Sequence, residues 1–156
     1  WKLTSETLGL PKAGRSAELD ALAAYVGSLT EPPRSPFSGE DVSAGRTLFH
    51  DPLVGCADCH FGPTFTDSQF LAPGQPLLHD VGTMSEASGQ RLGLELLGLD
   101  TPQLLGLWAT APYLHDGSAA TLREVLVDRN PSDEHGSTSH LTEEELLAME
   151  SYLLSL

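Results

Sequence analysis

Residues 56–60 read Cys56-Ala57-Asp58-Cys59-His60, and this stretch decides the fold. The pattern Cys-x-x-Cys-His is the attachment signal for c-type haem. At this spacing two thiols can reach the two vinyl groups on one edge of a porphyrin, and the next residue turns its imidazole toward the iron. We therefore predict one covalent haem c, attached at Cys56 and Cys59, with His60 as the proximal iron ligand.

Three other interpretations of the motif compete with this one. A zinc site needs four ligands, and the second pair would have to come from scattered histidines that lack ligand spacing. A thioredoxin-like redox pair would need a βαβ context, which the sequence lacks. The third is a chance match of two structural cysteines. No other cysteines are present, so a disulfide framework is not expected.

Composition narrows the class of protein. The chain has 156 residues, 40% of them hydrophobic, which allows one compact domain with an arm. A formal charge of −14 argues against nucleic acid as a partner. No apolar run approaches the roughly 18 to 20 residues that span a bilayer. The sequence has neither an initiator methionine nor a signal-peptide pattern, which indicates a start after processing or partway through a longer chain.

Hydrophobic spacing and capping residues predict a mainly α chain of short helices and long loops. We expect a linker and helix in residues 1–36, ending in a proline-rich hinge, and a haem domain in residues 37–156. Residues 61–90 are rich in glycine, proline and serine and predict a long irregular stretch without strands. The expected helices are 16–29, 40–49, a short helix from Thr101, one from Thr121, and 142–156.

The surroundings of the motif follow the pattern of cytochromes c. In that pattern a proline carbonyl shortly after the ligand accepts the other ring N–H, which fixes the imidazole tautomer. Pro63 is the expected acceptor. Gly45 and Phe49, together with the last helix around Tyr152 and Leu153, look like the crossed terminal helices of a cytochrome c-like domain.

Residues 107–122, LWATAPYLHDGSAATL, form a second diagnostic block. With the haem motif, this block resembles the C-terminal haem domain of bacterial diheme cytochrome c peroxidases and MauG-type enzymes, and the likeness spans about residues 39–156. The resemblance implies a cytochrome c-like domain wrapped around an electron-transfer haem. It also implies a preceding haem domain, of which residues 1–36 would be the end or a connection, and a location in the periplasm or on the outer cell surface.

The sixth iron ligand departs from the family pattern. Arg129 stands where the diheme peroxidases carry a methionine, and an arginine stays protonated. We rank His135, in a loop before Gly136, first as the distal ligand, and Met84 second. His140 ranks lower. The remaining candidates have simpler roles, in core packing for Met149 and at the surface or in hydrogen bonding for His50 and His79.

Three further residues are candidates for contact with the haem. Arg91 could pair with a propionate or lie solvated at the surface. Trp108 could pack on the porphyrin or in the core. The resemblance suggests that His115 is held near the haem edge, where it could act catalytically, although a structural histidine fits it as well. The sequence gives no support for calcium.

Ligation decides between two functions. If a side chain fills the distal position, the domain transfers electrons, with a redox partner protein or a second haem domain as its partner. This is the favoured prediction. An open position would instead give a peroxidase that acts on hydrogen peroxide. A haem-bearing sensor is a third, weaker interpretation.

Overall fold

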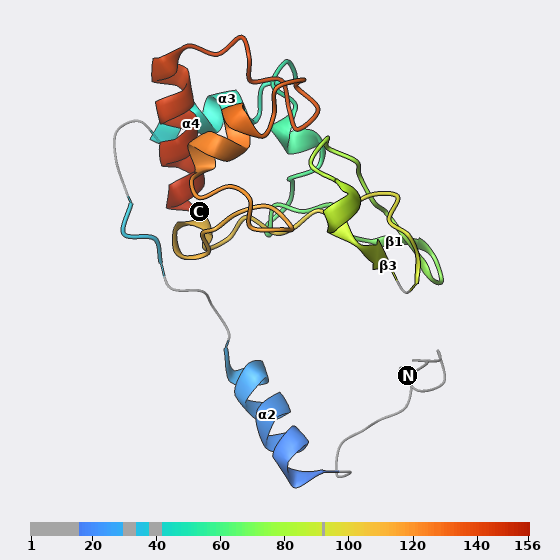
Figure 1. Ribbon diagram of the computed structural model, residues 1–156. Helices are drawn as coiled ribbons and strands as arrows, with labels where there is room; N and C mark the ends of the chain where they lie inside the picture. The colour runs from blue at the N-terminus through green and yellow to red at the C-terminus, as the bar shows by residue number, and fades with distance from the viewer. Residues whose placement is uncertain (1–15, 30–33, 38–41, 92) are drawn as a thin grey trace. The chain divides into compact units, whose positions relative to one another are not determined.

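The computed structural model describes residues 16–29, 34–37, 42–91 and 93–156 (Figure 1). The chain forms two compact units, Trp1–Pro32 and Pro33–Leu156. No helix of the described part is long and apolar enough to cross a membrane.

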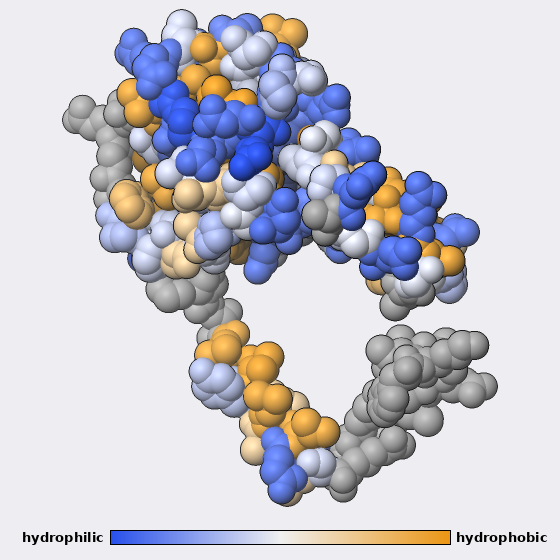
Figure 2. Space-filling view, in the orientation of Figure 1, coloured by the Kyte–Doolittle hydropathy of each residue, from blue (hydrophilic) through white to orange (hydrophobic). Residues whose placement is uncertain are grey.

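The described part of the first unit is helix α2 (Ala17–Ser28). The Ser16 hydroxyl accepts a hydrogen bond from the backbone N–H of Leu19 and caps the helix, as expected for residues 16–29. Figure 2 shows apolar side chains along the exposed surface of α2. These side chains are 55–65% exposed: Leu19, Leu22, Tyr25, Val26 and Leu29.

The second unit is built on the crossing of α3 (Val42–Phe49) and α4 (Glu143–Ser155). A Cβ on Gly45 would overlap the backbone of Ala148, so only glycine permits this close approach. Beside it, the ring of Phe49 contacts the ring of Tyr152, with centroids 5.3 Å apart. The predicted pair of crossed helices is therefore confirmed.

Helix α4 begins as its sequence predicts. The Thr142 hydroxyl accepts from the N–H of Glu145, and the Glu145 carboxylate accepts from the N–H of Thr142, which completes a capping box. The helix buries one stripe against the core: Leu146, Met149, Tyr152 and Leu153. Met149 is fully buried and fills the core, as expected.

The middle of the unit is less helical than predicted. The expected helix from Thr101 is wrong, because only a 3-10 turn, η3 (Leu107–Ala109), forms there, after Gly106 in a left-handed conformation. The expected helix from Thr121 is a short π-helical segment, η4 (Glu124–Asp128). The Thr121 hydroxyl accepts from the N–H of Glu124, but the Glu124 carboxylate reaches Ala120 instead, so the expected capping box is incomplete.

The stretch 61–90, expected to lack strands, contains one small antiparallel hairpin, and a second begins at its end, which corrects the sequence prediction. The first pairs β1 (Phe70–Ala72) with β2 (Gln75–Pro76). The second pairs β3 (Gln90–Arg91) with β4 (Leu94–Glu95). A 3-10 turn, η2 (Glu86–Ser88), lies between them. The unit thus combines few helices with short hairpins and long loops.

Candidate haem site

The two cysteines lie on a tight turn next to the helical core. Gly55 adopts a left-handed conformation with φ of 80° and starts the 3-10 turn η1 (Cys56–Asp58). Both thiols are free and partly buried. Burial raises the pKa of Cys56 to about 11, and burial followed by the charges of Asp67 and Asp58 raises the pKa of Cys59. Both cysteines are therefore neutral thiols near pH 7.

The imidazole of His60 is oriented by a backbone carbonyl. Its Nδ1 donates to the carbonyl of Phe65 at 3.0 Å, which leaves Nε2 with the lone pair. The expected acceptor, Pro63, is exposed and does not fill this role. Phe65 takes it over because its positive φ of 55°, two residues further along the turn, brings its carbonyl to the ring. The predicted second-shell bond exists, with a different acceptor.

His135 faces His60 across the site. The two ring centroids are 6.3 Å apart, with 44° between the ring planes. Two imidazoles that bind one metal ion through bonds of about 2 Å have centroids roughly 6 Å apart. Burial, followed by the proximity of His60, lowers the pKa of His135 to about 4. This histidine is therefore neutral near pH 7, the form that can bind a metal.

A network of hydrogen bonds fixes the loop that carries His135. Asn130 is only 4% exposed, and its carboxamide oxygen accepts from the backbone N–H of His135 at 2.8 Å. Its Nδ2 donates to the carbonyl of Gly136 at 2.7 Å and to the hydroxyl of Thr138 at 3.1 Å. A Cβ on Gly136 would lie 3.0 Å from the carbonyl oxygen of Val54, so the loop runs close to the cysteine motif.

Met84, the second choice for the distal position, lies elsewhere. It lines an open surface pocket of about 440 Å³ that includes Glu86, Gln90 and Glu95. Neither the cysteine motif nor His135 lines this pocket. Two other histidines are exposed: His140, and His50, whose Nδ1 donates to the carbonyl of Arg46.

The remaining candidates fall into three groups. His115 is exposed and shares a hydrogen bond of 2.8 Å with the hydroxyl of Ser88. Trp108 is partly buried, and its indole N–H is buried without a hydrogen-bond partner among the described residues. The side-chain hydroxyl of Thr83 is likewise buried without a hydrogen-bond partner among the described residues. The side chain of Arg91 lies outside the described part, so its pairing with a propionate stays a prediction.

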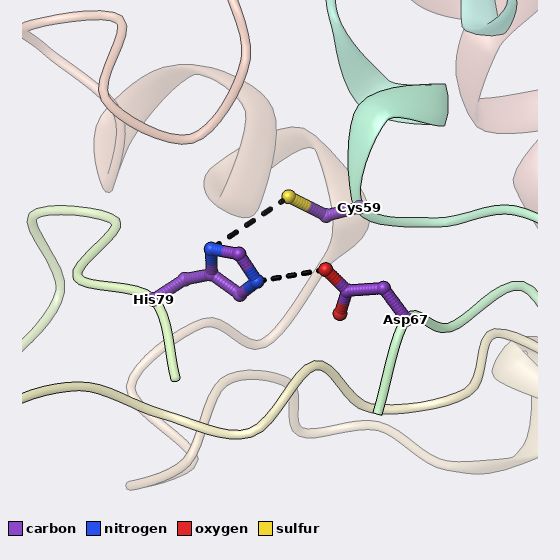
Figure 3. Close-up of side chains that lie close together, drawn as sticks. All are labelled: Cys59, Asp67 and His79. Carbon is purple, nitrogen blue, oxygen red and sulfur yellow. Dashed lines mark hydrogen bonds and ion pairs between the residues drawn. The ribbon is translucent and has the colours of Figure 1, made fainter. Parts of the chain in front are cut away.

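Sequence reasoning missed a pair beside Cys59. Nε2 of His79 donates to Oδ2 of Asp67 at 2.8 Å, and Nδ1 of His79 lies 4.0 Å from the sulfur of Cys59 (Figure 3). Asp67 is 8% exposed, and its Oδ1 has no partner among the described residues. We expected His79 to be a surface or hydrogen-bonding residue, and the second alternative is correct. No local spacing connects residues this far apart in the chain.

Comparison with known proteins finds chains that are similar to this one. The family described as RoxA-like, cytochrome c-like matches residues 98–133. The chain is 33% identical to hydrazine synthase subunit gamma of Kuenenia stuttgartiensis, over 88% of this chain and 48% of that subunit. It is 34% identical to the methylamine utilization protein MauG of Methylorubrum extorquens, over 56% of this chain and 24% of MauG. The chain is a relative of the MauG-type cytochromes c.

The fold agrees with this relationship. The structure superposes on a solved structure of hydrazine synthase from Kuenenia stuttgartiensis, pressurized with xenon, with a TM-score of 0.67 and 32% identity. The match covers 88% of this chain and 55% of that chain. The chain spans about half the length of hydrazine synthase subunit gamma and about a quarter of MauG.

A cytochrome c-like relationship implies a covalent haem c, and the residues of this chain fit one. Two free thiols stand at attachment spacing, and His60 turns an unprotonated nitrogen away from its carbonyl partner. The buried N–H of Trp108 lacks an acceptor within the described part. An unpaired buried donor is costly, and a propionate carboxylate is the kind of acceptor that would satisfy it.

Proposed function

We propose that the chain is a c-type haem electron-transfer domain whose iron is held by His60 and His135. The observation that carries this proposal is the 6.3 Å separation of the two ring centroids. In each neutral ring one nitrogen carries a lone pair that can bind a metal, since Nδ1 of His60 donates to Phe65 and His135 is neutral near pH 7. Haem c, when bound, supplies a one-electron Fe(III)/Fe(II) couple.

A filled distal position determines the role of the domain. With His135 in place, hydrogen peroxide has no coordination site, so His60 and His135 serve electron transfer rather than peroxide cleavage. Axial ligation by histidine gives a lower reduction potential than ligation by methionine. The charge of −14 favours a basic redox partner through electrostatic steering.

The proposal extends to a larger protein. The relatives are longer than this chain, and α2 exposes a row of apolar side chains that a further domain or partner would cover. We assign residues 1–36 to the end of a preceding domain or to an interdomain connection, and residues 37–156 to the haem domain. The second haem domain of a diheme oxidoreductase is one candidate for the redox partner. Because haem is attached outside the cytoplasm, the proposed location is the periplasm or the outer cell surface.

Absorption spectroscopy tests the proposed ligation. The chain should be produced with the machinery that matures c-type cytochromes, and its ferric and ferrous spectra recorded with and without cyanide and peroxide. We expect low-spin bands that neither ligand shifts. A high-spin spectrum with rapid peroxide reactivity would instead favour the peroxidase alternative. A colourless protein with two reactive thiols would contradict haem attachment.

Two variants identify the distal ligand. His135→Ala should convert the ferric spectrum from low-spin to high-spin, because it removes one of the two axial nitrogens. His140→Ala is the matched control, since this exposed histidine lies five residues away in the chain. Its spectrum should equal that of the wild type. A low-spin spectrum retained in His135→Ala would refute the assignment.

A further inference from the structure

The Asp67–His79 pair is not one of the ligands proposed for the iron, yet it lies against an attachment cysteine. Asp67 is buried to 8% exposure, whereas most carboxylates lie in water. One oxygen is bonded to His79, and the other has no hydrogen-bond partner among the described residues. Burying a carboxylate with an unsatisfied oxygen costs stability, so this position calls for an explanation beyond packing.

The carboxylate of Asp67 is ionised. Burial acts to raise its pKa, but the nearby Thr101 side chain and the hydrogen-bonded His79, which adds a positive charge whenever it is protonated, outweigh burial and leave the pKa below its usual value. Asp67 is therefore a fixed negative charge near pH 7 on a side chain that is itself little exposed.

The charge of Asp67 acts on two residues of the haem motif, Cys59 and His60. The electrostatic effect of Asp67 contributes to the pKa of Cys59, which it raises, and to the pKa of His60, where it opposes the lowering by burial. The same field acts on any change of charge at the metal that His60 binds. In a buried setting such an interaction is several times stronger than in water.

We propose that Asp67 sets the reduction potential of the haem, with His79 as the residue that positions its carboxylate. This inference rests on the proposed electron-transfer function. A negative charge stabilises the oxidised iron, which carries one more positive charge than the reduced iron. Asp67 therefore lowers the potential, in the same direction as axial histidines, and favours electron donation by the domain.

The geometry explains why His79 is part of the arrangement. Its Nε2–H is engaged by Asp67, so in the neutral tautomer Nδ1 carries the lone pair and faces the sulfur of Cys59. The imidazole separates the carboxylate from the sulfur and leaves the charge of Asp67 only partly compensated. The backbone of His79 is fixed by two hydrogen bonds with Leu99, at 2.9 and 2.7 Å.

The test is the midpoint potential of the haem-loaded protein, measured by spectroelectrochemistry. Asp67→Asn keeps the shape and an acceptor for His79 but removes the charge. We expect the equilibrium constant for reduction to rise about tenfold, which is about 59 mV for a one-electron couple. Asp58→Asn is the matched control, because Asp58 lies within the motif and also acts on Cys59 but is exposed. Its shift should be several times smaller, since water screens it.

The outcomes separate this inference from the proposed function. An unchanged low-spin spectrum with an unmoved or lowered potential in Asp67→Asn would refute the role of Asp67 alone. An equal shift in Asp58→Asn would also refute it, because burial would then have no influence. If Asp67→Asn does not mature, His79→Lys places a permanent positive charge beside the carboxylate, and the potential should again rise; no rise would overturn the proposal. A wild-type protein without a low-spin haem spectrum would refute the proposed function itself.

Discussion

Two loops compete to supply the distal ligand, and they are built differently. The His135 loop (residues 130–139) is tied together by buried side chains, whereas the Met84 loop (residues 83–89) is tied by bonds at its surface. In the Met84 loop, the hydroxyl of Ser88 accepts from the N–H of Ser85 and bonds to exposed His115. Whether a residue can serve as an iron ligand therefore depends on how its backbone is held as well as on its donor atom.

The His135 loop gains its order from two centres. Asn130 holds the backbone on both sides of His135, and Thr138, 3% exposed, donates its hydroxyl to the carbonyl of Leu126. Asp133 accepts from the backbone N–H groups of Thr138 and Ser139. The loop is also joined to the core beside the cysteine motif, because Ser137 donates its N–H to the carbonyl of Val54 at 2.8 Å.

The substitution expected to have the largest effect on the order of the His135 loop is Asn130→Ala. The substitution leaves the N–H of His135 and the carbonyl of Gly136 without these partners in a partly buried loop. We expect a loss of about 1 to 3 kcal/mol in the free energy of unfolding for each group that stays unsatisfied. The ferric spectrum should become a mixture of low-spin and high-spin iron, and chemical denaturation should give the loss of stability.

The control for this change is Ser137→Ala, which removes one long hydrogen bond of 3.3 Å to Asp133 in the same loop. Its spectrum and unfolding midpoint should stay close to those of the wild type. Asn130→Ala with a fully low-spin spectrum would show that His135 does not depend on this network.

The sequence predicted those parts whose signals are local. Ser16 and Thr142 cap α2 and α4 where their sequences indicate, and Gly45 marks the helix crossing. The short hairpins were missed, because strands of two or three residues have no measurable alternation. The expected helix at Thr101 failed because Gly106, in its left-handed conformation, interrupts the leucine-rich run.

The part of the site that could be predicted is likewise the part with a local sequence signal. The cysteine motif is contiguous, so its chemistry can be read directly. Phe65 replaces Pro63 as the partner of His60 through a positive φ, which no composition rule assigns to a phenylalanine. Asp67 and His79 meet only because the chain folds back between them. Contacts of this kind depend on tertiary structure and lie beyond sequence spacing.

A smaller effect is expected from Asp133→Ala. The hydroxyl of Ser139, the backbone N–H groups of Ser139 and Thr138, and the hydroxyl of Ser137 together lower the pKa of Asp133 to about 2. The residue therefore stays ionised and keeps these bonds across the neutral range. Its removal should speed hydrogen exchange at the N–H groups of Thr138 and Ser139, while the spectrum stays mainly low-spin. Exchange unchanged at both amides would contradict its role as a centre of the loop.

The smallest effect is expected from Met84→Leu, which tests directly whether the Met84 loop or the His135 loop supplies the distal ligand. Leucine keeps the apolar volume and removes the sulfur, so any change in the haem spectrum would report ligation by Met84. Because Met84 lies away from His60 and His135, the ferric spectrum should show two nitrogen ligands in the wild type and in the variant alike. The potential should also stay the same, because Met84 lines a surface pocket that His135 and the cysteines do not share.

If Met84→Leu gave high-spin iron while His135→Ala did not, the ordered loop would be a structural element and the surface loop the functional one. The hydrogen bonds around Asn130 would then need a reason other than holding a ligand.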